Sequence, residues 1–183
     1  MKIFLSLLVL PIFCFFGGVS SSLAASASEI RSEAKNALKE LYATNPKAKE
    51  LGVKAYAVLI FPNTLKGGLV VAAMRGDGVL FRQGEATGYY NITALSYGLQ
   101  VGAKKFNYAI FFMDKDNLKY LSESGGVSLG TAPSLTVVDK GIAGSLSTDS
   151  IQKGIYAFIF GQQGLMGGLG LQGSKISEFT PSE

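Results

Sequence analysis

The chain has 183 residues, 48% of them hydrophobic and 16% charged, with a net charge of +4 at pH 7. This balance excludes a chain that is disordered over its length, because disorder needs low hydrophobicity and high charge, and it suits one domain with a substantial core. The sequence contains no His, which excludes nucleophile pairs that depend on histidine and metal sites built from imidazole.

Residues 1–24 have the form of a secretory signal peptide. Lys2 precedes a nearly continuous apolar stretch over residues 3–16, and a Ser/Ala-rich segment follows. A basic start, an apolar middle and small residues at the cleavage point are the three parts of such a signal, and cleavage is predicted after Ala24 or Ala27. An uncleaved anchor is disfavoured, because the apolar stretch is shorter than the ~20 residues that a membrane span needs.

The single cysteine, Cys14, lies inside this leader. Lipoprotein anchoring at Cys14 is disfavoured, because Phe13 stands where a lipoprotein signal has a small residue. Cleavage would remove Lys2 from the 17 basic residues and leave 16 against 13 acids, a net charge of +3. We expect export across the inner membrane to a bacterial periplasm, where the mature chain would have no Cys to form a disulfide.

Residues 28–44 are predicted to form an amphipathic helix, capped by Ser26 or Ser28. Its apolar residues recur at helical spacing and form one arc: Ile30, Ala34, Ala37, Leu38 and Leu41. Arg31, Lys35 and Lys39 follow one border of this arc, and three acids lie on the other side. Either the arc docks on the rest of the domain, or the helix lies on a membrane surface with a basic shoulder.

Asn45 and Pro46 should end this helix and start a short second one that stops near Gly52. Strand patterns then follow with turn signals roughly 10 residues apart, which indicates a twisted antiparallel sheet or barrel. Gly76-Asp77-Gly78 is the strongest of these turn signals, and one later helix is predicted over 114–122. The strand candidates are 54–62, 67–76, 78–84, 86–93, 95–105, 107–113, 134–140, 155–161 and 165–176.

Three segments, 66–76, 96–105 and 166–175, resemble one another, each with Gly-Leu near its start and a basic residue at its end. Glycine inside a strand is costly unless backbones approach closely or the sheet bends, so we expect a tightly coiled or closed sheet. In the second segment, alternation places Gln100 between two glycines on one face. Either another backbone or a ligand occupies the space beside Gln100.

The pattern of acids gives no sign of catalysis or metal binding. The segment 114–117, "DKDN", starts like a calcium loop but continues with Leu118 and lacks the central glycine. The remaining acids stand singly, and no glycine-rich stretch has the Gly-Lys-Ser/Thr ending of a phosphate-binding loop. We expect no enzyme activity, no metal and no cofactor.

Basic residues are the remaining candidates for function. Several stand at strand ends next to glycines, where they form either a solvated rim or a site for an anionic head group. Together with the three on the first helix, the candidate lipid-binding residues are Arg31, Lys35, Lys39, Lys66, Arg75, Lys104, Lys105, Lys140 and Lys175.

The order of several segments resembles that of the SYLF domain, a lipid-binding domain also known from yeast actin-patch proteins. The segments are "VLIFPNTLKGGLVV", "GDGVL", "TGYYNITALSYGLQVGAKK", "FFM", "LTVVDKGIAGSL" and "IYAFIFGQQGLMGGLGLQGSKI". The resemblance covers roughly Leu51 to Ile176. It implies membrane-lipid binding without catalysis, directed to phosphoinositides in eukaryotic members. Part of the lipid contact is attributed there to a basic amphipathic N-terminal segment, whose place is taken here by the helix from Ile30 to Tyr42.

The sequence as a whole therefore predicts an α+β domain over residues 28–183. Its main element would be an antiparallel, strongly bent or barrel-like sheet, with the N-terminal helix 28–44 and one or two short helices. We expect a non-catalytic, exported protein that binds anionic phospholipid at a membrane surface and does not bind nucleic acid. The alternatives are a structural or protein-interaction module of the cell envelope, and a carrier that encloses an acyl chain. Actin binding belongs to longer eukaryotic proteins and is not carried over.

Overall fold

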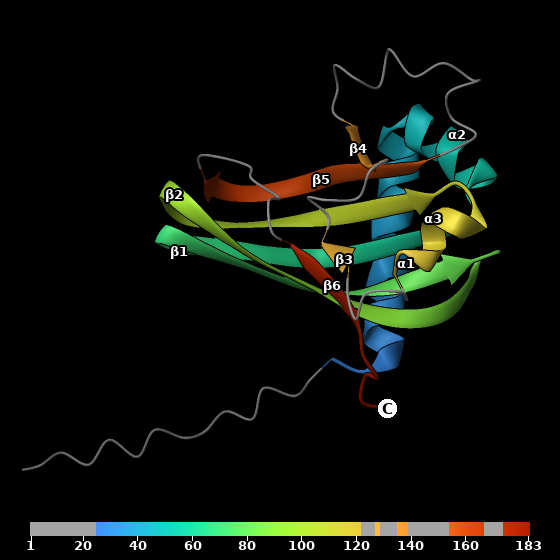
Figure 1. Ribbon diagram of the computed structural model, residues 1–183, viewed down its shortest axis with the longest axis horizontal. Helices are drawn as coiled ribbons and strands as arrows, with labels where there is room; N and C mark the ends of the chain where they lie inside the picture. Colours follow the sequence, from blue (N-terminus) through green and yellow to red (C-terminus); the bar gives the residue numbers. More distant parts are fainter. Residues whose placement is uncertain (1–24, 122–126, 129–134, 139–153, 167–173) are drawn as a thin grey trace, which may run out of the picture.

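The computed structural model describes residues 25–121, 127–128, 135–138, 154–166 and 174–183 (Figure 1). The predicted signal peptide, Lys140 and part of the third repeated segment lie outside these ranges. In chain order the elements are α1 Ala27–Thr44, α2 Pro46–Lys54, β1 Ala57–Arg82, β2 Glu85–Phe112, α3 Lys115–Lys119, β3 Val127–Ser128, β4 Leu135–Val138, β5 Ile155–Met166 and β6 Lys175–Glu178.

The predicted N-terminal helix is confirmed as α1, and a single residue joins it to α2. Ser26 caps α1 by accepting a hydrogen bond from the Glu29 amide at 3.3 Å. Asn45 serves both helices, since its amide donates to the Leu41 carbonyl at 2.8 Å and its side-chain oxygen accepts from the Ala48 amide at 3.0 Å. This cap fixes the angle between α1 and α2.

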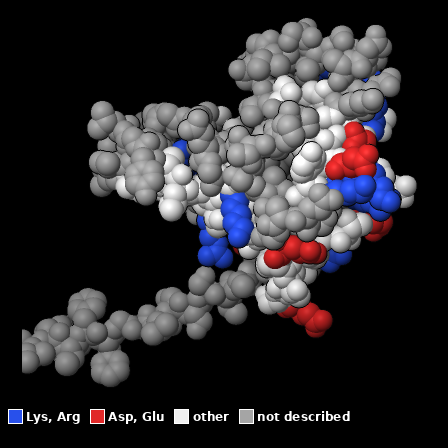
Figure 2. All heavy atoms as spheres, viewed as in Figure 1, with Lys and Arg blue, Asp and Glu red and all other residues white. Residues whose placement is uncertain are grey.

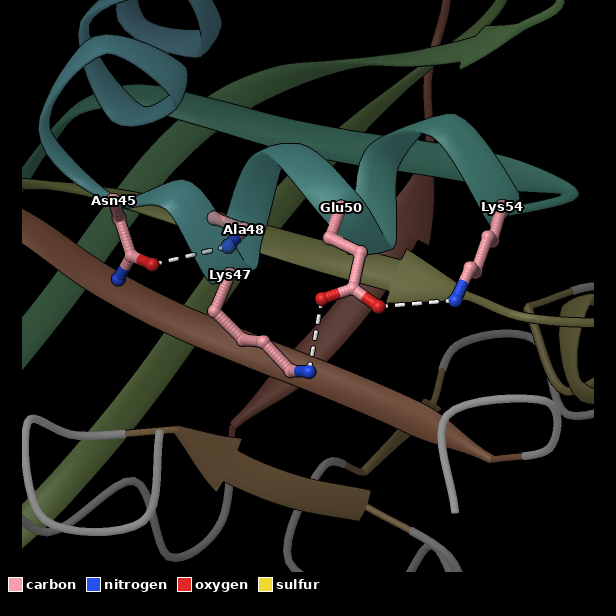
Figure 3. A network of polar contacts seen from close by, with 5 residues as sticks. All are labelled: Asn45, Lys47, Ala48, Glu50 and Lys54. Atoms are coloured by element: carbon pink, nitrogen blue, oxygen red, sulfur yellow. Dashed lines mark hydrogen bonds and ion pairs between the residues drawn. The ribbon is translucent and has the colours of Figure 1, made fainter. Parts of the chain in front are cut away.

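On the outer side of α2, Glu50 accepts hydrogen bonds from Lys47 at 2.9 Å and from Lys54 at 3.0 Å (Figure 3). Each ion pair joins residues one helical turn apart. The second pair reaches Lys54, which lies past the residue where the sequence predicted the helix to end. That predicted end near Gly52 was wrong. Gly52 lies inside α2, where the Tyr42 phenol occupies the place that a side chain at residue 52 would fill.

The sheet is dominated by one long hairpin of β1 and β2, which have 26 and 28 residues. The predicted turn at Gly76-Asp77-Gly78 was wrong, since these residues are internal to β1. The chain turns instead at Gln83 and Gly84, whose φ values of 52° and 85° fit a two-residue type I′ turn. The separate strands predicted between residues 54 and 113 are therefore two continuous strands.

The hairpin doubles over on itself near Gly68, so that it extends to one side of the molecule and returns (Figure 1). At the bend, a Cβ on Gly68 would collide with the Val71 carbonyl. Farther along, a Cβ on Gly78 would collide with the Ile60 carbonyl, so two stretches of β1 that are far apart in sequence touch. We call the end of the molecule around residues 65–75 and 94–105 the bend end.

The six described strands form one sheet in the order β3-β6-β2-β5-β4, with β1 paired to β2. All pairs are antiparallel except β4 with β5, and the sheet does not close. The α+β class and the strongly bent antiparallel sheet are thus confirmed. None of the described helices has the length and hydrophobicity that crossing a membrane requires.

Two hydrophobic cores follow from the alternation of side chains on the strands. One face of β2 places Ala109 and Phe111 against α1 and α2, where the arc of α1 is buried, and we call this the outer core. The helix therefore docks on the sheet, as the first of the two interpretations predicted. The opposite face places Phe106, Tyr108 and Ile110 between the two halves of the doubled hairpin. This inner core stops at the bend end, where lysines replace the apolar residues.

Candidate functional site

The bend end combines basic side chains with a sequence free of acids. Residues 57–76, 86–113 and 154–177 contain no Asp or Glu. On the face seen in Figure 2, acidic side chains lie over the right half, whereas basic side chains extend into the left half, toward the bend. The electrostatic potential at this end is therefore positive, and it attracts anions.

Lys66 and Lys104 form the centre of the site. They face each other across β1 and β2, and only 4% and 5% of their surfaces are exposed. Each lies two residues from an inward-facing residue of the same strand, Thr64 on β1 and Phe106 on β2, so the strand alternation turns both lysines toward the interior. We call these two residues the lysine pair.

The charges of the lysine pair are poorly compensated. The Lys66 Nζ is buried and has no hydrogen-bond partner among the residues that the structure describes. The Lys104 Nζ lies 5.4 Å from the centre of the Phe106 ring, a cation–π contact. Burial lowers the pKa of Lys66, and burial together with the nearby charge of Lys66 lowers the pKa of Lys104. A buried cation without a counter-charge is costly, so this pair favours a bound anion.

A surface hollow of about 370 Å³ lies beside the lysine pair. Its other lining residues come from both strands of the hairpin and from β5: Leu65, Gly67, Ala103, Lys105 and Gln163. Lys105 is exposed at the rim, where it also borders a second hollow that contains Glu40 of α1. Because Leu65, Ala103 and Lys105 are exposed and alternate with the buried Lys66 and Lys104, the hollow lies on the outer side of the strand pair, with Lys105 as its exposed cation.

Three exposed apolar residues belong to the bend end, and one of them, Leu65, lines the hollow. Leu65, Leu95 and Val71 are 61%, 59% and 43% exposed. Strand pairing places Leu65 directly opposite Lys105. We call these three residues the apolar rim. A cationic hollow next to exposed apolar side chains can bind a charged head group and the apolar layer beneath it.

The other candidate residues fall into separate places. Arg75 and Lys175 flank Thr93 from the strands on its two sides, and both are exposed. Arg31, Lys35 and Lys39 are exposed on α1, away from the bend end, and Lys140 lies outside the described residues. The structure thus brings together Lys66, Lys104 and Lys105, pairs Arg75 with Lys175 along one row of the sheet, and leaves the α1 group apart.

Sequence reasoning missed the apolar rim and Gln163, and it did not anticipate that two of the lysines are buried. The signal was present in the repeated segments 66–76 and 96–105. When these are aligned as antiparallel partners, the lysine that precedes Gly67-Gly68 lies opposite the lysine after Gly102-Ala103. The side chains of residues 97–101, including Gln100, are not described, so the alternatives for Gln100 stay predictions.

Asp114 and Asn117, from the segment that begins like a calcium loop, form a helix cap. Asp114 accepts hydrogen bonds from the Asn117 amide at 2.8 Å and from its side-chain nitrogen at 2.6 Å. No group of three or more acidic, Cys or His side chains that could hold a metal ion occurs in the described ranges.

Comparison with known proteins gives one family. Residues 93–181 match the model of the Ysc84 family, described as Las17-binding protein actin regulator. The match contains Lys104, Lys105 and Lys175, whereas Lys66 and α1 precede it. No curated protein matches the chain.

Proposed function

We propose that the chain, whose residues 93–181 match the Ysc84 (SYLF) family model, is a non-catalytic member of that family that binds anionic phospholipid at a membrane surface. The observation that carries the proposal is the lysine pair: two buried cations that face each other, lie beside a surface hollow with the exposed Lys105, and lack a compensating acid in the neighbouring strand sequence. An anionic phosphate group has the charge and the size that this arrangement accepts.

Binding would begin with long-range attraction of the bend end to a negative surface. Each basic residue near such a surface contributes ~1 kcal/mol, and the attraction falls off within a Debye length of about 10 Å at moderate salt. Lys105 and Arg75 are exposed and act first. The head-group phosphate then enters the hollow beside Lys105, where its charge lowers the electrostatic cost of the nearby Lys66 and Lys104, while the apolar rim contacts the layer beneath the head groups.

The α1 helix would contribute charge but no insertion. Its apolar arc is buried against the sheet, with Ile30, Ala34 and Leu41 each 3% exposed or less. An amphipathic helix needs a free apolar face to enter a membrane interface. Lipid contact through α1 is therefore limited to its basic border, unless the helix leaves the sheet at the cost of the outer core.

We propose further that the leader directs the protein to a bacterial periplasm, where it would be peripheral on a membrane. A second candidate function is binding of an acidic protein partner in the cell envelope, because the same basic bend end would suit acidic side chains. The family description names Las17 and actin, which an exported protein would not meet inside its own cell. An acyl-chain carrier is less favoured, since aromatic side chains fill the inner core of the described strands.

Co-sedimentation with vesicles tests the proposal. The purified protein is mixed with phosphatidylglycerol, cardiolipin or phosphatidylcholine vesicles at low and high salt. We expect binding to the two anionic lipids that weakens at high salt, and none to phosphatidylcholine. Absence of binding to both anionic lipids at low salt would refute the proposal, and capture of an envelope protein without lipid binding would favour the second candidate.

Variants locate the binding surface. Lys104→Glu/Lys105→Glu should lower the vesicle affinity by about 30-fold or more, because two contributions of ~1 kcal/mol are lost and reversed. Lys49→Glu/Lys115→Glu makes the same change in net charge at two exposed positions on α2 and α3 and should lower it far less. Since Lys104 is buried, Arg75→Glu/Lys105→Glu repeats the test with exposed residues alone. Equal losses in all three variants would show that net charge, not the bend end, determines binding.

A further inference from the structure

A second concave site lies at the helical end of the molecule, away from the lysine pair. It is a groove of about 620 Å³ between α1, α2, the start of β1 and the turn after β1. This volume falls within the range of about 300–1,000 Å³ that small-molecule sites occupy. The residues of α1 that line it are Lys35, Leu38, Lys39 and Tyr42. Their spacing places them along one stripe of the helix.

The groove is apolar along its walls and cationic along one side. Leu38, Val58 and Phe81 supply apolar surface, and Val53 stands at the groove with 83% of its surface exposed. Lys35 and Lys39 are exposed, and neither belongs to an ion pair within the described part of the chain. None of the residues that line the groove is acidic. The site thus has the charge to hold an anion and the surface to hold a hydrocarbon chain.

Tyr42 adds a neutral hydrogen-bond donor between these two parts. Its phenol lies against Gly52 of α2, and burial raises its pKa to about 12. It therefore keeps its proton at neutral pH and can donate to an anion that Lys35 and Lys39 attract. A side chain larger than that of Gly52 would push the phenol into the groove, so the absence of a side chain at position 52 keeps the groove open.

We propose that this groove binds a single-chain anionic amphiphile, of which a free long-chain fatty carboxylate is the simplest. The carboxylate lies between Lys35, Lys39 and the Tyr42 hydroxyl, and the hydrocarbon chain lies along Leu38, Val58 and Phe81. Charge complementarity selects this occupant, because a neutral chain would leave both lysines uncompensated and a cation would be repelled. The site is separate from the bend end and does not depend on membrane binding.

Fluorescence displacement tests the proposal on the purified protein without vesicles. A dansyl-labelled fatty carboxylate serves as the probe, and hexadecanoate and hexadecanol compete for it below the concentrations at which they aggregate. We expect hexadecanoate to displace the probe and hexadecanol to do so at least about tenfold more weakly, since the alcohol lacks the charge. Failure of the probe to bind, or equal competition by the alcohol, would overturn the proposal.

Two groove variants and a matched control place the site. Lys35→Ala/Lys39→Ala removes the cations, and Val53→Asp adds a negative charge at an exposed position. Both should weaken hexadecanoate binding by about tenfold or more. Arg31→Ala/Lys49→Ala removes the same number of charges outside the groove and should change the affinity for hexadecanoate by less than about twofold. Unchanged binding in both groove variants would overturn the proposal, as would displacement of the probe by an acidic amphipathic peptide in preference to hexadecanoate.

The same variants in the vesicle assay separate the two proposals. Val53→Asp should bind phosphatidylglycerol vesicles as the wild type does, and Lys104→Glu/Lys105→Glu should bind hexadecanoate as the wild type does. If only Lys104→Glu/Lys105→Glu loses hexadecanoate binding, the fatty carboxylate binds at the lysine pair and the groove proposal is refuted. If the wild-type protein binds hexadecanoate but not anionic vesicles, the membrane function is refuted and the groove proposal is unaffected.

Discussion

Replacement of Lys66 by Met should make the protein more stable. Lys66 is 4% exposed, its Nζ has no hydrogen-bond partner among the described residues, and Lys104 faces it across the strand pair. Met keeps a side chain of similar length without the charge. Exchange of a buried ionic group for a well-packed apolar one stabilises proteins by about 1–4 kcal/mol. We expect a gain of about 2 kcal/mol, or a rise in Tm of roughly 4–8 °C for a domain of this size.

The pH dependence of the stability provides an independent test of the same prediction. Burial lowers the pKa of Lys66 in the folded state, so the unfolded chain holds the proton more tightly. The unfavourable contribution of Lys66 is fully present below its folded pKa, diminishes as the pH rises through that value, and is gone above the ordinary lysine pKa of about 10.4. The stability gap between Lys66→Met and wild type should therefore narrow as the pH rises from about 7 toward about 9.5.

The pH series stops below the range where tyrosines interfere. Burial raises the pKa of Tyr42 to about 12 and raises the pKa of Tyr108 as well. Above a pH of about 10 their phenols ionise in the unfolded chain first, which lowers the stability of wild type and variant alike. Because this loss is common to both proteins it leaves the gap unchanged, but it lowers both stabilities, so the pH series stops below it.

Urea unfolding in a buffer without phosphate measures the change, with Lys105→Met as the control. Lys105 is exposed beside the same hollow, so its replacement removes a charge without relieving burial and should change the stability by less than about 0.5 kcal/mol. A Lys66→Met protein no more stable than wild type would refute the reasoning, since Lys66 would then have a compensating partner. The variant should also bind anionic vesicles less tightly.

Three further predictions concern the fold that positions the two sites. Gly78→Ala should destabilise the domain by roughly 3 kcal/mol, because the new Cβ meets the Ile60 carbonyl, whereas Gly67→Ala, whose nearest neighbour would lie at 3.6 Å, should be nearly neutral in the same thermal unfolding assay. Asn45→Ala should cost about 1 kcal/mol by removing the cap of α2, measured by urea unfolding, and Asn45→Asp should recover most of it. Phe111→Ala should lower the free energy of unfolding by about 3–5 kcal/mol, because the Phe111 ring is fully buried and its centre lies 5.3 Å from the centre of the Phe158 ring. A loss below about 1 kcal/mol in urea unfolding would mean that the outer core closes over the gap.

The helices could be predicted from the sequence because their signals are local. Ser26, Asn45 and Pro46 act within a few residues of themselves, and the arc that starts at Ile30 has a period that only a helix satisfies. The end of α2 was missed for a different reason. Gly52 normally marks a helix end, and the Tyr42 phenol that requires a glycine there comes from another element.

The path of the sheet could be predicted only in part. Glycines in the strands indicated close approach of backbones, and the structure confirms this at Gly68 and Gly78. The same residue type also marks turns, so Gly76-Asp77-Gly78 was taken for a turn and the true turn at Gln83-Gly84 was missed. Local sequence does not distinguish a glycine that turns the chain from one that makes room for a distant strand.

The candidate site was predicted in its residues but not in its geometry. Lys66, Lys104 and Lys105 were identified by their positions at strand ends, where solvated lysines are equally common. That two of them are buried depends on the register of β1 and β2, which is set by the turn and by the irregularities near Phe61 and Leu69. A shift of either strand by one residue would turn its lysine outward, and no local pattern reports such a shift.

The long hairpin also determines the order in which the molecule can assemble. Pairing of β1 with β2 can start at Arg82 and Glu85, beside the turn, and extend one pair at a time to Ala57 and Phe112. Each added pair closes only a slightly longer loop, so the entropy cost at every step stays small although the final contacts are far apart in sequence. Lys66 and Lys104 meet only after this growth has passed the bend. In a chain whose pairing grows from the turn, the cationic hollow forms late, and a chain that stalls earlier presents no anion site.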